Sequence, residues 1–200
     1  KIIFSSFKKD ANELVINYKY HKNEIPILNN SVGIEINSKV ISQTADENSI
    51  IFFGSLGYEP NITAIEYLVK DIMPLVWERE PQLQLIIAGR NPSQHLYNKC
   101  KKENIRIIEN PPNMSVHIRN SIICVAPMIS GSGQQFKILE AMSNMTPVIT
   151  TSKGSIPLGL EHNKNVLVAD TAIEFAKAII LLKANRELRS KLTKSANIFI

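Results

Sequence analysis

A glycine-containing turn and the segment after it hold the residues best suited to chemistry. The turn is Gly131-Ser132-Gly133, and glycine lets a backbone approach a ligand closely. A helix that starts directly after the turn would present free N–H groups and the positive end of its dipole, which together bind phosphate. Lys137 and Glu140 follow Gly133 at i+4 and i+7, so they share one helix face. We predict a site that runs along the helix. The N–H groups at its start and the Lys137 ammonium would neutralise a diphosphate, and Glu140, further along, would bind ribose hydroxyls.

Spacing alone leaves simpler alternatives open for this cluster. Lys137 and Glu140, at i and i+3, could form a surface ion pair worth a few tenths of a kcal/mol. The glycine turn could be an ordinary tight turn, because it follows the fourth predicted strand and lacks the third glycine of the dinucleotide fingerprint. A GxxxxGK[ST] phosphate loop is absent from the sequence.

The elements that would position these residues alternate along the chain from residue 50 onward. Short, continuous apolar runs, many of them β-branched, suit strands that are buried on both faces. Strands that alternate with helical patterns imply right-handed βαβ crossovers. The predicted fold is therefore α/β: a Rossmann-like, doubly wound parallel sheet of about six strands with helices on both faces. The predicted strands are 50–53, 83–89, 105–108, 122–127, 147–152 and 165–170.

Four helices are predicted between or after these strands. The first is expected to begin at Asn61 as a cap and to end or kink near Pro74. The last opens with Thr171 and Glu174 at the spacing of a capping box. The other two are predicted at 93–103 and 133–145.

In an open sheet of this kind, ligands bind beyond the carboxyl ends of the strands, near the point where the strand order reverses. The loops after the first four predicted strands are therefore the places to look, and the loop after the fourth is the most informative. Arg90 follows a glycine at the end of the second strand, where it could lie over a nucleotide or simply face solvent. The candidate nucleotide- and diphosphate-binding residues are Gly54, Ser55, Arg90, Gly131, Ser132, Gly133, Lys137 and Glu140, and of these Lys137 and Glu140 are the catalytic candidates.

Composition narrows the class of protein. The net charge of +5, from 23 basic and 18 acidic residues, favours anionic partners such as phosphates, nucleic acid or an acidic membrane surface. Basic runs interleaved with aromatics, typical of single-strand nucleic-acid binders, are absent from the sequence. Cys100, Cys124 and the four histidines fit no metal-ligand spacing, so we expect reduced thiols and no metal. The expected location is the cytoplasm, with peripheral membrane association as an option.

Several sequence blocks, in order, resemble one enzyme family. KILEAMSNMTPVITTS at 137–152 resembles the block K-x-LEAMA-x-G-x-PV-x-TS of the group 1 family of retaining glycosyltransferases, which have two facing Rossmann-like domains (GT-B). The segments AP-x-x-SGSGQQFK, FFGSLGYEPNITAIEYLVKDIMP and IIAGRNPS resemble further blocks of a branch of that family. The likeness runs from about residue 50 to 190, and IPILNNSV resembles the interdomain IPNGV segment. The resemblance implies the C-terminal, donor-binding half of a GT-B enzyme.

Residue roles are carried over from this resemblance by position. Glu140 matches the second glutamate of the family's paired-glutamate motif, which is expected to hold the donor ribose. Lys137 and Gln135 match the branch's Q-x-K motif, which faces the diphosphate. The 131–133 turn would supply backbone donors to phosphate or sugar.

Two departures from the family pattern concern charge. Ser132 stands where the commoner pattern has its first glutamate. An Arg and a Lys usually bind the diphosphate in this family. The corresponding positions here are Ser55 and, approximately, Pro60. The charge clamp is therefore expected to come mainly from Lys137, with the helix dipole and Arg90 as further contributors.

The resemblance implies transfer of a sugar from a nucleotide diphosphate sugar to a saccharide or lipid-linked acceptor, with retained anomeric configuration and without a metal. Residues 1–49 are interpreted as a remnant of the N-terminal domain and interdomain linker, and residues 50–200 as the nucleotide-sugar-binding domain. The chain starts without Met and stops within a helical pattern, so we interpret it as a piece of a larger enzyme. We expect it to bind nucleotide without turnover when its N-terminal domain is missing.

Three alternatives stay open at this point. A sugar-nucleotide epimerase can use the same two-domain fold. A non-catalytic nucleotide-sugar-binding or scaffold module would tolerate Ser132 and the absent Arg and Lys. Nucleic-acid binding is supported by charge alone and would require a strongly salt-dependent affinity.

Overall fold

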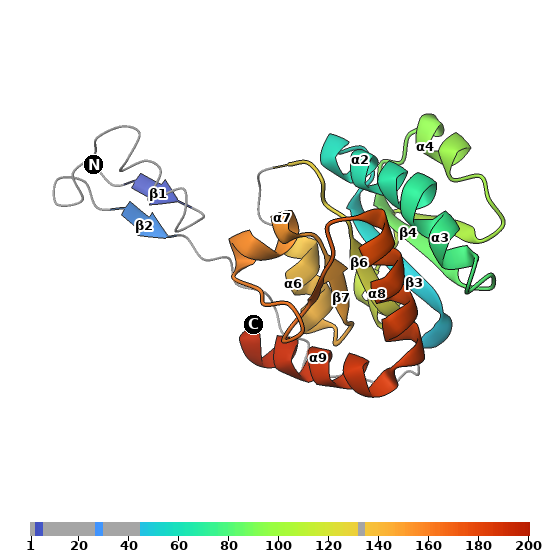
Figure 1. Cartoon of the computed structure of the whole chain (residues 1–200). Coiled ribbons are helices and arrows are strands. Elements are labelled where there is room, and N and C mark those ends of the chain that lie inside the picture. The colour runs from blue at the N-terminus through green and yellow to red at the C-terminus, as the bar shows by residue number, and fades with distance from the viewer. Residues whose placement is uncertain (1–2, 6–26, 30–44, 132–134) are drawn as a thin grey trace. The chain divides into compact units, whose positions relative to one another are not determined.

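The chain consists of two units. The computed structural model describes residues 3–5, 27–29, 45–131 and 135–200 (Figure 1). The smaller unit is Lys1–Glu35, where β1 (Ile3–Ser5) and β2 (Ile27–Asn29) pair in parallel. The larger unit is Ile36–Ile200. The domain boundary predicted at residues 49 and 50 stays a prediction, since 30–44 lie outside the described residues.

Six parallel strands form the sheet of the larger unit, and this confirms the predicted fold class. Their order is β5-β4-β3-β6-β7-β8, so the chain moves outward from β3 on one side and then from β6 on the other. The strand order reverses between β3 and β6, and this is the place where an open α/β sheet binds ligands. The bounds are β3 Asp46–Ser55, β4 Gln84–Arg90, β5 Ile105–Glu109, β6 Ser121–Ala126, β7 Val148–Thr150 and β8 Leu167–Val168, and each overlaps one predicted strand.

Helices cover both faces of this sheet (Figure 1). One layer packs α8 against α3 and η1, and the other packs α5 against α6. The helical elements are α2 Glu59–Tyr67, the π-helix η1 Leu68–Ile72, α3 Met73–Trp77, α4 Gln94–Lys99, α5 Met114–Asn120, α6 Phe136–Ser143, α7 Ser152–Ser155, the 3-10 helix η2 Ile156–Leu158, α8 Ala172–Ala184 and α9 Arg186–Phe199. In the described part of the chain, no helix combines the length and the apolar character that crossing a membrane requires.

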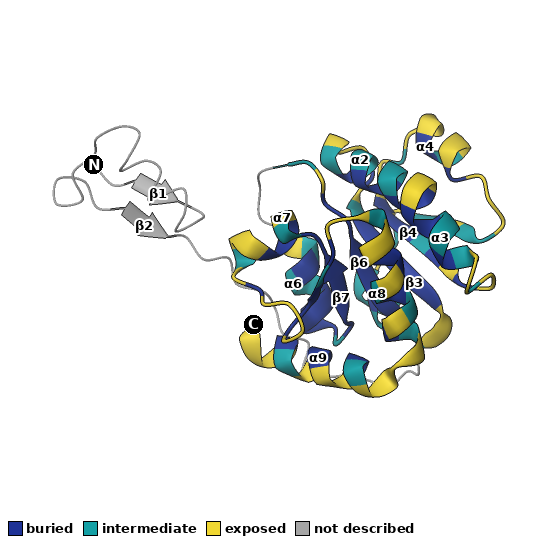
Figure 2. Ribbon diagram, in the orientation of Figure 1, coloured by how far each residue is buried: buried dark blue, intermediate teal, exposed yellow. Residues whose placement is uncertain are grey.

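Burial follows the position of each strand in the sheet (Figure 2). The central strand β3 is buried from Ile50 to Phe53, and every residue of its neighbour β6 is buried. Both strands carry apolar side chains on both faces because helices cover both faces. The edge strand β5 has no fully buried residue. The most continuous apolar runs therefore identify the two strands between which the order reverses.

Two details of the first helix differ from the prediction. Tyr58 is the N-cap of α2, and Asn61 lies inside the first turn with a buried side chain, so its predicted role as a cap is wrong. The helix starts earlier because Pro60, which lacks an N–H, is well tolerated in the first turn. The predicted end or kink near Pro74 is instead a change of helix type, in which the π-helix η1 leads directly into α3. A π-helical turn accommodates the missing N–H of the proline without ending the helix.

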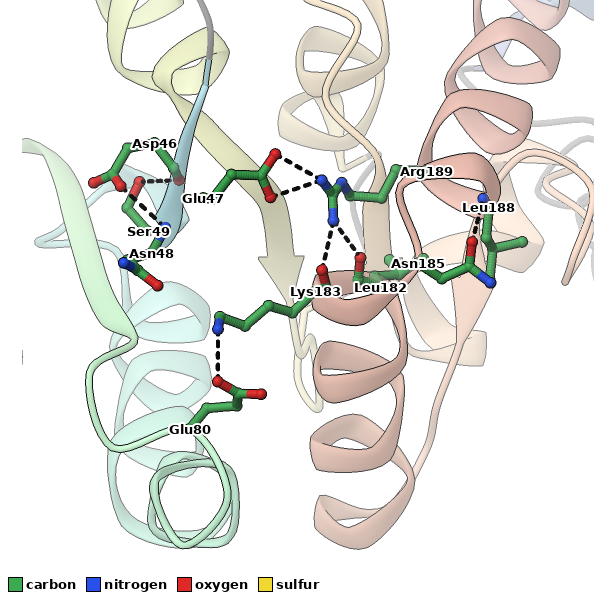
Figure 3. Close-up of polar contacts among 10 residues, drawn as sticks. All are labelled: Asp46, Glu47, Asn48, Ser49, Glu80, Leu182, Lys183, Asn185, Leu188 and Arg189. Atoms are coloured by element: carbon green, nitrogen blue, oxygen red, sulfur yellow. Dashed lines mark hydrogen bonds and ion pairs between the residues drawn. The ribbon is translucent and has the colours of Figure 1, made fainter.

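Polar contacts hold the last two helices in place (Figure 3). The predicted capping box is confirmed: Thr171 accepts a hydrogen bond from the Glu174 N–H, and the Glu174 side chain accepts one from the Thr171 N–H. Asn185 caps the start of α9 through the Leu188 N–H. Lys183 pairs with Glu80 at 2.6 Å and thereby connects α8 to the segment that follows α3.

Candidate functional site

The carboxyl ends of β3 and β4 meet at two glycines. Gly54 and Gly89 are register partners in the parallel ladder. A Cβ added at Gly89 would lie 1.7 Å from the Gly54 carbonyl oxygen, so a side chain at residue 89 does not fit. Gly54 has φ +150°, a value that L residues rarely adopt. These two glycines let the strand ends approach closely at the edge of the sheet where ligands are expected.

The ammonium of Lys137 lies at this same edge. A Cβ at Gly54 would lie 3.3 Å from the Lys137 Nζ, which places the side chain of α6 directly against the end of β3. The Nζ also lies 4.5 Å from the centroid of the buried Phe52 ring and 3.8 Å from the Met128 Sδ. Phe52 and Gly54 share one face of β3 because strand side chains alternate. The structure therefore brings together Lys137 and Gly54, two of the residues predicted to bind the ligand.

Asn61 provides the hydrogen bond that holds this ammonium. Lys137 Nζ donates to the Asn61 Oδ1, and the Asn61 Nδ2 donates to the Ser55 carbonyl oxygen at 2.8 Å. Lys137 makes no ion pair with Glu140 or with any other acidic group among residues 45–131 and 135–200. The alternative of a Lys137–Glu140 surface ion pair is therefore wrong. The ammonium is instead turned toward the strand ends and bound by neutral groups.

Desolvation determines the electrostatics of the site around Lys137. Desolvation lowers the pKa of Lys137 from 10.5 to about 8, a shift that only an ionised Cys124 would oppose. Burial also raises the pKa of the Cys124 thiol to about 12, so this thiol is neutral and adds no negative charge. A half-buried, partly desolvated cation without a carboxylate partner is costly, and an anionic ligand would relieve that cost. The site is thus electrostatically suited to an anion.

Glu140 lies one turn further along α6. Its side chain is half-buried, and desolvation raises the pKa of its carboxyl group. The carboxylate accepts no hydrogen bond from any residue in the described ranges. A carboxylate that is half-desolvated and has no protein donor is suited to accept hydrogen bonds from ligand hydroxyls.

The turn before α6 is described only in part. Gly131 has φ +89°, and a Cβ added there would lie 3.2 Å from the Pro60 Cβ, so this turn lies against the start of α2. Gln135 is the N-cap of α6, and its side chain makes no capping hydrogen bond. The helix begins at Phe136 rather than 133, so Lys137 lies in its first turn. The predicted backbone donors Ser132 and Gly133 lie outside the described residues.

Arg90 and Ser55 lie at the neighbouring strand ends. They are register partners, and the Leu56 N–H donates to the Arg90 carbonyl oxygen at 2.7 Å. Both side chains are exposed, and neither makes a hydrogen bond or ion pair to Lys137. Arg90 thus lies beyond the same edge of the sheet as Lys137 but is not part of the buried cluster.

Sequence reasoning missed three side chains that surround the ammonium: Asn61, Phe52 and Met128. Phe52 and Met128 are apolar and looked like ordinary core residues. The signal for Asn61 was its place in the Pro60-Asn61 pair. A proline in the first turn moves the start of the helix before it, which leaves the asparagine free to use its amide elsewhere.

Comparisons with known proteins concern the family and the fold of the chain. A family model described as Glycosyl transferases group 1 matches residues 47–185. A curated relative from Klebsiella pneumoniae, "Uncharacterized 44.6 kDa protein in cps region", is 27% identical over 161 residues. That match covers 76% of this chain and 41% of the relative, so this chain spans well under half the length of that protein.

Solved structures of glycosyltransferases share the fold. The pneumococcal O-GlcNAc transferase GtfA, in complex with UDP and GlcNAc, superposes with a TM-score of 0.74 at 18% identity, over 99% of this chain and 40% of GtfA. A mutant of S. aureus TarM, in complex with Fondaparinux, alpha-GlcNAc-glycerol and UDP, gives 0.76 at 17% identity, over 100% of this chain and 40% of TarM.

A third structure is a single domain. The C-terminal domain of a glycosyl transferase group 1 family protein (LpcC) from Francisella tularensis gives a TM-score of 0.62 at 18% identity, over 78% of this chain and 85% of that domain. Identities this low show the fold alone, and it is the fold of one half of a GT-B enzyme. With the family model matching 47–185, this chain belongs to the group 1 glycosyl transferases and has the fold of their C-terminal domain.

Proposed function

We propose that this domain binds the diphosphate of a nucleotide diphosphate sugar at the edge where β3 ends and α6 begins. One observation carries the proposal: the Lys137 ammonium is desolvated beside Gly54 and has no acidic partner among residues 45–131 and 135–200. A diphosphate would supply the missing countercharge. The first turn of α6 adds the positive end of its dipole.

The proposed reaction is glycosyl transfer with retention of configuration. Negative charge builds on the departing diphosphate while the anomeric carbon becomes cation-like. Donors that are already positioned lower this barrier because they need no reorganisation during the reaction. Lys137 is held by Asn61 before any ligand arrives, so it meets this requirement. No metal is needed for this step.

Glu140 is proposed to bind the ribose of the donor. Its half-buried carboxylate has acceptor capacity that no described residue uses. Two vicinal hydroxyls can donate to one carboxylate. Exposed Arg90 and Ser55 at the neighbouring strand ends are proposed as outer contacts of the nucleotide.

The relatives suggest the first ligand to test. GtfA and TarM were solved in complexes with UDP, so we propose a uridine diphosphate sugar as the donor. The Klebsiella relative lies in a cps region, which supports a role in making a surface polysaccharide or glycolipid. A saccharide or lipid-linked acceptor is proposed to bind mainly to an N-terminal domain of the whole enzyme. The 200-residue chain alone is therefore expected to bind nucleotide without turnover.

Calorimetric titration of the chain with UDP, GDP and ADP tests the donor site. We expect selective binding of one nucleotide, which Lys137→Met weakens at least about tenfold because the diphosphate loses the partly desolvated cation at the end of β3. Lys177→Met is the matched control, since Lys177 is exposed on α8. Absence of binding to all three nucleotides would reject the donor site in favour of a scaffold role. Sugar transfer by the chain alone would reject the expected need for an N-terminal domain.

A further inference from the structure

The Asn61 side chain connects two elements that the candidate site requires. Its Nδ2 donates to the Ser55 carbonyl oxygen just beyond β3, and its Oδ1 accepts from the Lys137 ammonium on α6. Only 5% of the residue is exposed, so the amide itself is largely shielded from bulk water. Both ends of the amide are used, which fixes its orientation: the oxygen must face the ammonium because the nitrogen faces a carbonyl.

Space around the amide is closed on the strand side. A Cβ at Gly54 would lie 3.0 Å from the Asn61 Nδ2, so the amide packs directly against the glycine. Lys137 in turn is confined by the Phe52 ring and the Met128 sulfur. Among these neighbours Asn61 provides the one oxygen acceptor, whereas Phe52 and Met128 attract the cation only weakly. The position of the charge therefore depends on this amide.

We propose that Asn61 is a positioning residue, whose carboxamide holds the Lys137 ammonium at the end of β3 in the orientation that receives the ligand diphosphate. This inference rests on the proposed donor site and deepens it. A neutral amide is suited to the task, because it orients the ammonium without cancelling its charge. A carboxylate in the same place would neutralise the cation and repel a diphosphate.

Other ionisable groups near Lys137 are few. Within the described residues, Cys124 of β6 is the titratable group that acts on the ammonium, and Glu140 of α6 acts in turn on Cys124. The Cys124 thiol is neutral well beyond pH 8 because burial raises its pKa to about 12. A substitution of Asn61 should therefore change the pKa of Lys137 without a contribution from the ionisation of Cys124.

The test measures the pKa of Lys137 in the free chain by NMR of 13C-labelled lysine side chains, with the signal assigned by its loss in Lys137→Met. Asn61→Asp should raise this pKa by at least about one unit, because it places an opposite charge within hydrogen-bond distance. Asn61→Leu removes the acceptor and should lower the pKa. Asn165→Asp is the matched control, since Asn165 is also a buried asparagine but bonds to the Glu161 N–H before β8. It should leave the pKa of Lys137 unchanged.

Calorimetry with UDP supplies the second readout. Both Asn61 variants should weaken UDP binding at least about tenfold, although they move the pKa in opposite directions, and a purely structural role would not produce that pattern. If Asn61→Leu does not fold, the comparison of Asn61→Asp with Asn165→Asp decides alone. An unchanged Lys137 pKa in Asn61→Asp overturns the inference. If the wild-type chain binds no UDP, the donor site fails, and the NMR titration still decides whether Asn61 positions Lys137.

Discussion

The guanidinium of Arg189 on α9 donates two hydrogen bonds to the carboxylate of Glu47, at 2.8 and 2.7 Å, although 142 residues separate them (Figure 3). The other terminal nitrogen of Arg189 donates to the Leu182 and Lys183 carbonyl oxygens at 2.7 Å. Arg189 therefore provides hydrogen bonds to the last carbonyl groups of α8 and attaches α9 to the start of β3. The strand that carries Gly54 at one end is held by this arginine at the other.

Replacing Arg189 with Met should destabilise the chain by roughly 2–3 kcal/mol, because the variant leaves two helix-end carbonyls and a carboxylate without their charged donor. Urea denaturation of the chain measures the change. Glu47→Gln is the partner variant, and it should cost less than about 1 kcal/mol since the Glu47 side chain is 60% exposed and stays hydrated. Equal costs for the two variants would contradict the view that the backbone carbonyls are the main partners of Arg189.

A side chain at residue 89 should be poorly tolerated. The Cβ of Gly89→Ala would lie 1.7 Å from the Gly54 carbonyl oxygen, so β3 and β4 must move apart. We expect a loss of at least about 2 kcal/mol in unfolding free energy, as in other overpacked sites. Gly57→Ala is the control: its Cβ would lie 3.2 Å from its nearest neighbour, the Asn91 carbonyl oxygen, and the expected change is below about 1 kcal/mol. Wild-type stability of Gly89→Ala would show that the strand ends are not in close contact.

The lowered pKa of Lys137 predicts a specific pH dependence of stability. The folded chain releases this proton at about pH 8, whereas the unfolded chain keeps it until about 10.5. Between these values the unfolded state binds more protons, so the wild type gains stability as the pH rises, by up to about 1.4 kcal/mol per unit. Below pH 8 the charged, desolvated lysine lowers stability.

Chemical denaturation of wild type and Lys137→Met at pH 7, 8, 9 and 10 isolates this contribution. The free energy of unfolding of the wild type minus that of Lys137→Met should increase over this range, since other groups titrate alike in both chains. A difference that is constant with pH, or one that decreases, would show that Lys137 has no lowered pKa in the folded chain.

Glu140→Gln should affect stability and binding in opposite directions. Burial raises the pKa of the Glu140 carboxyl group, so the charged form lowers stability at neutral pH and is lost on substitution. We expect a small rise in melting temperature in the absence of ligand, together with UDP binding weakened by about tenfold. Glu187→Gln, on the outer surface of α9, should change neither quantity. Unaltered UDP affinity in Glu140→Gln would remove Glu140 from the donor site.

The architecture could be predicted from the sequence because its signals are local. The runs that became β3 and β6 are apolar throughout, and this pattern depends only on strands having helices over both faces. The Thr171–Glu174 capping box likewise depends on residues three apart. The placement of Lys137 and Glu140 on one helix followed from the period of a helix, and the structure has both on α6.

Tertiary structure alone decided what each of these side chains contacts. Lys137 could have paired with Glu140, and the spacing allowed it. The structure turns Lys137 toward Asn61, which is 76 residues earlier in the chain. The arrangement of β3 beside β6 brings these residues together, and the strand order cannot be read from either segment by itself. The burial of Arg189 against Glu47 is of the same kind, since a helical arginine normally faces water.

The chain sequence by itself therefore determined the six strands, four of the helical segments, the α/β class and the segment that carries the candidate anion site. The strand order, the partner of the Lys137 ammonium and the desolvation that lowers its pKa were decided only by the folded structure. The physical reason is range: helix and strand periodicities act over a few residues, whereas burial and pairing depend on segments that the fold brings together from distant parts of the chain.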